Sequence, residues 1–222
     1  MLRDWQDLVL FIDGEALVID KPAGLAVHPG PRTRASLEDH LDALRFGFQR
    51  PPMPVHRLDR DTSGCLLLAR NPKAHKCFAG AFAAGRVEKL YVAAVERAFP
   101  EGSEGLIDMP LLKRSARREG WRMVASPEGR PARTRWKVIM ATAARALMAF
   151  IPETGRTHQV RAHAAYGLGA PIVGDPVYGR GGEPMLLHAL ALRVPRDGKP
   201  AIEARAPLPS AFAAAGFDDA RF

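Results

Sequence analysis

The sequence predicts an α+β fold with a mixed, mostly antiparallel central sheet flanked by helices and loops. Segments with strand character outnumber helical ones, and the two kinds do not alternate strictly along the chain, as a doubly wound parallel sheet would require. The 222 residues are 47% hydrophobic and 25% charged, which is enough apolar material for a substantial core. We expect residues 1–222 to form a single domain.

The N-terminal half predicts two strands and two helices. The apolar runs at 16–20 and 65–69 are bounded by turn residues, which is typical of short buried strands. Residues 36–46 predict a helix capped by Ser36, because leucines recur on one face and acidic residues occupy the first turn. Residues 71–89 predict a second helix.

The C-terminal half is dominated by strands, with a third helix at 156–168. A polar, arginine-rich section at 113–135 contains Trp121 and Met123 in alternation with polar residues, which predicts a hairpin arm. We expect further strands at 89–96, 133–141, 144–152, 185–194 and 201–207, the second and third of them paired.

Nothing in the sequence indicates a membrane or secreted protein. No apolar run approaches the ~20 residues that span a bilayer, and charged residues interrupt the N-terminal segment where a signal peptide stays apolar. Two cysteines, Cys65 and Cys77, are too few for a disulfide framework. We therefore expect a cytoplasmic protein that makes no contact with a membrane.

The net charge of +8 comes almost entirely from arginine, with 25 Arg against 7 Lys. The planar guanidinium matches phosphate geometry and stacks on bases, so the excess favours a nucleic-acid partner. GC-rich coding also raises Arg together with Ala, Gly and Pro, and this chain is rich in all four. Composition leaves both explanations open.

A dense polar stretch, HRLDRDTSG, runs directly into the apolar strand CLLLA. Asp59 and Asp61 are two residues apart, so an extended chain points both the same way. Arg57 and Arg60 are placed to keep one carboxylate ionised. We interpret Asp61 as part of a structural ion-pair loop and Asp59, between two arginines and before a rigid strand, as a functional carboxylate.

A second candidate is the segment ETGRTHQVRAH. Thr157 is a plausible helix N-cap, which places Arg156 where helix-terminal amides form an anion site. His158 and Arg161 are three apart and would share a helix face. Taken alone, the segment is better explained as a surface helix with solvated arginines.

The remaining patterns exclude several kinds of site. His158 and His163 are five apart, which a helix does not bring onto one face, and neither HExxH nor CxxC is present, so a zinc site is not predicted. Phosphate-loop, dinucleotide and serine-hydrolase motifs are also absent. A carboxylate nucleophile in basic surroundings suits the glycosidic bond of a nucleotide in RNA or DNA, without metal or cofactor.

The motifs together resemble the RluA-type RNA pseudouridine synthases. HRLDRDTSG is similar to the segment around the family's catalytic aspartate, DKPAGLAVHPG to its early lysine-proline motif, and KLYVAAV to its tyrosine strand. TGRTHQVRAH with PIVGDPVYG is similar to its arginine motif and following loop, and MLLHALAL to its late strand. Cys65 stands where a leucine is more usual, a mild change in packing.

The resemblance implies an isomerase that converts uridine to pseudouridine within RNA. It implies that Asp59 is the catalytic carboxylate, that Arg156 pairs with it, and that Tyr91 packs on the uracil. Arg57 would fill the gap left by the flipped uridine, and Leu187 would form an apolar wall of the pocket. Neither a metal nor another cofactor is implied.

Further contacts with RNA are expected from the same motifs and from the hairpin arm. His56, Thr157 and His158 are expected to bind the substrate uridine. Family members often carry an N-terminal S4 domain; here the first motif begins at residue 20, so we expect a stand-alone catalytic domain, acting as a monomer, that grips RNA with its own surface. The residues expected on that surface are Lys113, Arg114, Arg117, Arg118 and Trp121.

The sequence does not separate transfer RNA from ribosomal RNA as the substrate, because folded RNA is recognised by shape rather than by a linear code. A non-catalytic RNA-binding protein and a nucleic-acid N-glycosylase are the competing hypotheses. Pure binding has no need of the retained Asp59, Tyr91 and Arg156, and a glycosylase would release free uracil.

Overall fold

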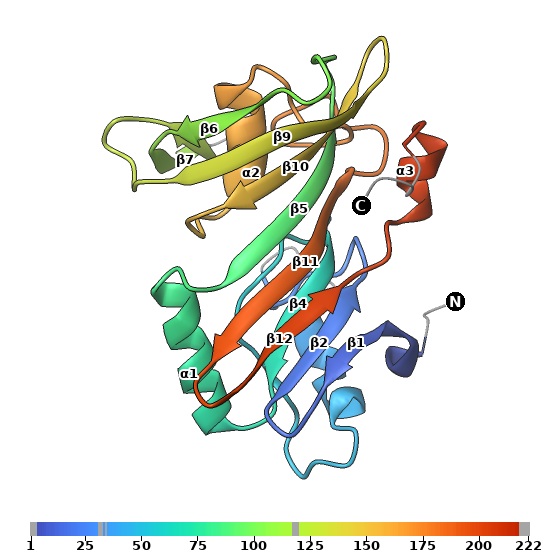
Figure 1. The fold of residues 1–222 in the computed structure, drawn as a ribbon, viewed down its shortest axis with the longest axis vertical. Coiled ribbons are helices and arrows are strands. Elements are labelled where there is room, and N and C mark those ends of the chain that lie inside the picture. The colour runs from blue at the N-terminus through green and yellow to red at the C-terminus, as the bar shows by residue number, and fades with distance from the viewer. Residues whose placement is uncertain (1–3, 31–32, 34, 117–119, 218–222) are drawn as a thin grey trace. The chain divides into compact units, whose positions relative to one another are not determined.

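The computed structural model describes residues 4–30, 33, 35–116 and 120–217. Contacts divide the chain into two compact units: Met1–Lys89 with Ala189–Pro207, and Leu90–His188 with Leu208–Phe222. Antiparallel strand pairs dominate both units and helices are few (Figure 1), which confirms the predicted α+β fold. That the chain is a single domain stays a prediction.

The strands of the first unit follow the order β1, β2, β4, β11, with β12 paired to β11 and β3 to β4. Every strand predicted for this part of the sequence is confirmed. Their bounds are β1 Val9–Ile12, β2 Ala16–Lys21, β3 Met53–Pro54, β4 Ser63–Ala69, β11 Leu187–Arg196, of which residues 189–196 belong to this unit, and β12 Lys199–Arg205.

Strand β4 is buried along its whole length, and most of β2 is buried beside it. The two strands pair antiparallel from Ala16 opposite Ala69 to Lys21 opposite Gly64. A strand covered on both faces carries a continuous apolar run rather than an alternating one, which explains the CLLLA sequence.

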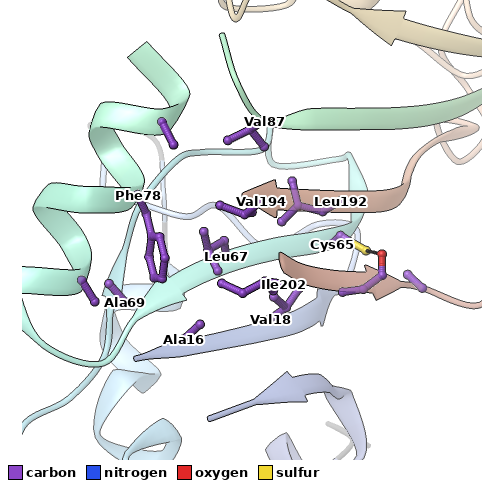
Figure 2. Packing of buried hydrophobic residues seen from close by; sticks show 14 residues of the cluster. Ala16, Val18, Cys65, Leu67, Ala69, Phe78, Val87, Leu192, Val194 and Ile202 are labelled. Atoms are coloured by element: carbon purple, nitrogen blue, oxygen red, sulfur yellow. Dashed lines mark hydrogen bonds between the residues drawn. The ribbon is translucent and has the colours of Figure 1, made fainter. Parts of the chain in front are cut away.

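Helix α1, Pro72–Ala83, packs on one face of this sheet. Figure 2 shows Phe78 of α1 beside Leu67 and Ala69 of β4. Cys65 lies in the same cluster, and burial raises the pKa of its thiol to about 12. Its Sγ lies 3.5 Å from the carbonyl oxygen of Leu190, so Cys65 is a packing residue with a weak donor.

The helix predicted after Ser36 is present over Leu37–Leu44, but it is a 3₁₀-helix. Ser36 is the N-cap residue, as expected, and its N–H donates to Oδ2 of Asp39 at 2.7 Å in a capping box. Caps specify where a helix begins and leave its pitch to the packing of the turns. A short 3₁₀-helix, Trp5–Leu8, precedes β1.

The second unit contains a four-stranded antiparallel sheet in the order β5, β10, β9, β6. Strands β9 and β10 pair as predicted, and the predicted hairpin arm is the separate two-stranded ribbon β7–β8. The bounds are β5 Glu88–Val95, of which residues 90–95 belong to this unit, β6 Glu104–Asp108, β7 Leu111–Ala116, β8 Gly120–Ala125, β9 Arg133–Ala141 and β10 Ala146–Pro152.

The helix that follows β10 begins later than predicted. Helix α2 covers Gln159–Ala162 and continues as a π-helical segment, His163–Gly167. Its N-cap is His158, so the prediction that Thr157 caps the helix is wrong. A short helix that was not predicted, α3 at Ser210–Ala214, buries Phe212. In the part of the chain that the structure describes, no helix combines the length and hydropathy that a membrane crossing requires.

Candidate active site

Asp59 lies in the loop between β3 and β4 of the first unit. The loop closes in a tight turn, because the N–H of Thr62 donates to the carbonyl of Asp59 at 3.1 Å. Asp59 is half-buried, whereas Arg57 is exposed. The turn passes directly into the rigid strand β4, which fixes the position from which the Asp59 side chain projects.

Lys21, at the end of β2, ties this loop to the loop that follows β2. Its side chain is completely buried, and Nζ donates to the carbonyls of Pro22 at 2.7 Å, Leu25 at 2.7 Å and Arg60 at 3.2 Å. Burial lowers the pKa of Lys21 to about 7, although the negative charges of Asp61, Asp59 and Asp20 oppose the shift.

Sequence reasoning assigned no role to Lys21 beyond the lysine-proline motif. One feature of the sequence could have indicated its role: Lys21 is an ionisable residue at the end of a buried strand. A buried ammonium group must find hydrogen-bond acceptors for its N–H groups. Those partners are backbone carbonyls of two loops, and the sequence does not show which carbonyls meet.

Arg60 and Asp61 form an exposed, bidentate ion pair. Nε of Arg60 lies 3.0 Å from Oδ1 of Asp61, and Nη2 lies 3.1 Å from Oδ2. The interpretation of Asp61 as part of a structural ion-pair loop is confirmed. Arg60 therefore directs its guanidinium at Asp61.

His56 anchors the beginning of the same loop. Its Nε2 accepts a hydrogen bond from the N–H of Leu67 in β4 at 3.0 Å, and its ring stacks on Phe82 with centroids 4.5 Å apart. An imidazole that accepts through Nε2 is neutral, and burial lowers the pKa of His56 to about 3. The structure gives His56 a positioning role, and its contact with substrate stays a prediction.

In the second unit, Tyr91 and Leu187 belong to one apolar cluster. Leu187 is buried in that cluster, and the ring of Tyr91, partly buried, packs against it. Tyr91 is paired with Phe150 of β10, on the face of β5 that also carries Ala93 and Val95. The side chains of Tyr91 and Val92 point to opposite faces of β5, because consecutive residues of a strand alternate.

The segment that carries Arg156 is fixed by the side chain of Gln159. Oε1 of Gln159 accepts from the N–H of Arg156 at 2.9 Å and from the hydroxyl of Thr154 at 2.7 Å. Its Nε2 donates to the carbonyl of Arg133 and to Oγ1 of Thr134, each at 2.9 Å. One buried amide thus joins the loop to β9, a role that sequence reasoning missed.

The guanidinium of Arg156 is oriented by a backbone contact. Its Nε donates to the carbonyl of Pro131 at 3.0 Å. Together with the bond from its own N–H to Gln159, this contact fixes both the backbone and the side chain of Arg156. A positioned guanidinium suits recognition of a carboxylate or a phosphate.

The spacing predicts that His158 and Arg161 share a helix face, and this prediction is wrong. His158 precedes the helix, whereas Arg161 forms a buried ion pair with Asp175 at 2.7 and 2.8 Å. Asp175 also accepts from the N–H groups of Val177 and Tyr178. Burial raises the pKa of Asp175, but the hydrogen bond and charge of Arg161 outweigh it and leave the pKa below its usual value.

The hairpin β7–β8 contacts the segment before α2 through aromatic rings. Trp121 stacks on His158, and Oη of Tyr178 lies 3.1 Å from Nδ1 of His158. Lys113 and Arg114 are exposed on β7. Arg117 and Arg118 lie outside the described residues. The expectation that neither metal nor cofactor takes part stays a prediction.

Comparison with known proteins identifies the family. The model of the family described as RNA pseudouridylate synthase matches residues 15–166, which include Asp59, Tyr91 and Arg156. The chain belongs to this family. An uncharacterized RNA pseudouridine synthase of Zymomonas mobilis is 55% identical over 213 residues, which cover 94% of this chain and 97% of the relative.

More distant members of the family agree with the fold. The ribosomal large subunit pseudouridine synthase D of Nitrosomonas europaea is 36% identical over 85% of this chain, which spans 54% of that protein. The structure of human RNA pseudouridylate synthase domain containing 4 superposes with a TM-score of 0.78 at 27% identity, over 94% of this chain and 91% of the human one. Members of the family are isomerases that modify RNA, and the predicted fold and class of enzyme are confirmed.

Proposed function

We propose that this chain converts specific uridines to pseudouridine in ribosomal RNA, transfer RNA or both, with Asp59 as the catalytic carboxylate. The anchoring of the Asp59 loop carries the proposal: the half-buried His56 and the buried Lys21 bond to the backbone at its two sides, and the loop leads into the rigid strand β4. Such rigidity suits a carboxylate that must meet one carbon atom of a flipped nucleotide. The name of the Nitrosomonas relative supports ribosomal RNA as one substrate.

In the proposed reaction the N1–C1′ bond of uridine breaks, a C5–C1′ bond forms, the C5 proton leaves to solvent, and N1 takes up a proton, so that the product is an isomer of the substrate. Asp59 has three chemically distinct routes: attack on C1′, addition to C6, or removal of the 2′ proton to give a glycal. Each route requires the ionised carboxylate. The three share a product and differ in the atom of the nucleotide that Asp59 touches.

The other proposed residues serve binding, charge and shape. Arg156 pairs with Asp59 and keeps it ionised, while Tyr91 packs on the uracil and assists removal of the C5 proton. Arg57, exposed on the loop, occupies the space that the flipped uridine leaves in the RNA stack. Leu187 forms the apolar wall, and His56, Thr157 and His158 line the substrate site.

The surface proposed to bind RNA lies on the hairpin β7–β8. It comprises Lys113 and Arg114, which are exposed, and Trp121, together with Arg117 and Arg118. We propose that the chain acts as a monomer in the cytoplasm.

The first experiment measures tritium release from transfer RNA and ribosomal RNA labelled at uracil C5. Wild type should release the label to water, because forming the C5–C1′ bond expels the C5 hydrogen. Asp59→Asn should bind RNA and release none. Asp61→Asn is the matched control: it makes the same chemical change in an exposed ion pair and should turn over near the wild-type rate, since such pairs are worth about 0–1 kcal/mol.

The outcomes separate the competing functions. Residual isomerisation by Asp59→Asn would remove Asp59 from the catalytic role. Free uracil as a product would indicate an N-glycosylase, whereas binding without release from either RNA by wild type would favour a non-catalytic RNA-binding protein.

A further inference from the structure

An aromatic cluster joins the hairpin β7–β8 to the segment before α2, within the second unit. The rings of Trp121 and His158 are stacked, with centroids 4.8 Å apart and an interplanar angle of 26°. The ring of Tyr178 meets His158 edge-on at 5.7 Å, and Tyr166 meets Tyr178 edge-on at 5.9 Å.

Hydrogen bonds fix this cluster to the backbone. The hydroxyl of Tyr178 accepts from the N–H of Met123 in β8 at 2.9 Å and shares a second bond with Nδ1 of His158. His158 has φ 52°, a left-handed conformation that costs free energy in a residue other than glycine and persists only where surrounding contacts hold it. The rings are therefore set in place before any ligand arrives.

The cluster is open to solvent at its aromatic ends. Trp121 is 39% exposed and Tyr166 is 43% exposed. A tryptophan that served only to dock the hairpin would gain most by complete burial. Partial exposure of a ring already braced on one neighbour leaves surface for a further planar group.

The charges around the cluster select the kind of partner. The ammonium group of the exposed Lys113 lies 4.8 Å from the centroid of the Trp121 ring, on the same face of the ribbon β7–β8. Aromatic rings bordered by cations are typical of surfaces that bind single-stranded nucleic acid, where bases stack and phosphates meet the cations. An apolar protein surface would leave the ammonium group of Lys113 without a counter-charge.

We propose that Trp121, braced by His158, is a stacking platform for one unpaired base of the RNA, adjacent to the uridine that reacts. This inference rests on the proposed function, since His158 is two residues from Arg156, which that function places at the target uridine. Lys113 contacts a phosphate of the stacked nucleotide. A base displaces the Lys113 ammonium readily, because a cation–π contact at an exposed site is weaker than base stacking on tryptophan.

Binding to three labelled RNAs tests the platform: a single-stranded oligouridylate, a stem-loop and a blunt duplex. Trp121→Ala should weaken binding to the first two roughly tenfold and leave the duplex unchanged, while Trp121→Phe should stay within about threefold of wild type. Leu106→Ala is the matched control, because it truncates another exposed hydrophobic side chain, on β6. Equal effects of Trp121→Ala and Leu106→Ala, or equal loss on the duplex, would overturn the platform.

Tryptophan fluorescence tests the platform without removing Trp121. The chain has three tryptophans, so replacing Trp5 and Trp136 by phenylalanine leaves Trp121 as the only emitter. Oligouridylate should quench its emission and the duplex should not. Unchanged emission at saturating oligouridylate would contradict stacking.

The two proposals fail in different ways. If binding depends on Trp121 but no tritium is released from C5-labelled RNA, the result supports base stacking on Trp121 and contradicts the proposed synthase activity. If wild type releases tritium and Trp121→Ala has the KM and RNA affinity of wild type, the result supports the synthase activity and contradicts base stacking on Trp121.

Discussion

His56, which is half-buried, and Lys21, which is buried, are ionisable residues that anchor the Asp59 loop in opposite ways. His56 is neutral and accepts a hydrogen bond from a backbone N–H, whereas Lys21 donates to three backbone carbonyls. Each satisfies polar backbone groups that would otherwise be buried without partners. The loop is therefore held by side-chain-to-backbone bonds as well as by apolar packing.

The neutral state of His56 predicts a pH-dependent stability. Its pKa is about 3 in the folded chain against about 6.5 unfolded. Between these values the unfolded state binds a proton that the native state does not, so stability falls as pH drops below about 6.5. At about pH 5 this loss amounts to about 2 kcal/mol.

The variant His56→Gln keeps an acceptor for the N–H of Leu67 and does not titrate. The free energy of unfolding, measured by urea denaturation, should fall less in the variant than in wild type between about pH 7.5 and about pH 5, the difference being about 2 kcal/mol. The same fall in both proteins would show that His56 is not held neutral.

At the scale of elements, β4 approaches β11 unusually closely at Gly64. Gly64 has φ 106°, and a Cβ atom there would lie 2.2 Å from the carbonyl oxygen of Ala189. Only glycine satisfies both conditions. Gly64, the second residue of β4, therefore marks a close contact between two strands.

Gly64→Ala should lower the free energy of unfolding by about 3 kcal/mol, because the new methyl group forces apart β4 and β11 and the backbone conformation is strained. Gly80→Ala is the matched control in α1, where a Cβ meets nothing within 4 Å. It should stabilise the chain by about 0.5–1 kcal/mol. Urea denaturation followed by circular dichroism checks both, and equal effects would argue against the close approach.

At the scale of the whole molecule, many arginines are engaged with carboxylates. Arg161 pairs with Asp175 in the interior, and Arg193 and Arg196 pair with acidic residues near the surface. The positive excess that remains for a polyanion is the net charge of +8 rather than the 25 arginines. The ion pairs are compatible with both explanations of the arginine excess, a nucleic-acid partner and GC-rich coding. The dependence of RNA binding on salt concentration distinguishes the two.

RNA binding should weaken steeply with salt if exposed cations such as Arg57 and Lys113 meet phosphates. With roughly four to six phosphate contacts, the logarithm of the affinity should fall against the logarithm of salt concentration with a slope of about −3 to −5. Arg57→Gln should make that slope shallower by about one. Fluorescence anisotropy at several salt concentrations measures the slope, and a flat response would rule out an extended RNA footprint.

The sequence by itself determined the elements and the family. Apolar periodicity is a local property, so β2, β4, α1 and the β9–β10 pair could be predicted from runs of a few residues. The ordered motifs around Asp59, Tyr91 and Arg156 indicated the family, which the comparisons confirmed. The fold class followed from the excess of strands over helices.

Tertiary structure alone decided which side chains hold the candidate site. Lys21 bonds to the carbonyl of Arg60, thirty-nine residues away, and Gln159 bonds to that of Arg133, twenty-six residues away. It also decided that the helix begins at Gln159, because Gln159 uses its amide to bind the preceding loop and His158 is drawn into the left-handed conformation against Tyr178. Such contacts depend on which backbone groups approach in space, and no local pattern of residues records that distance.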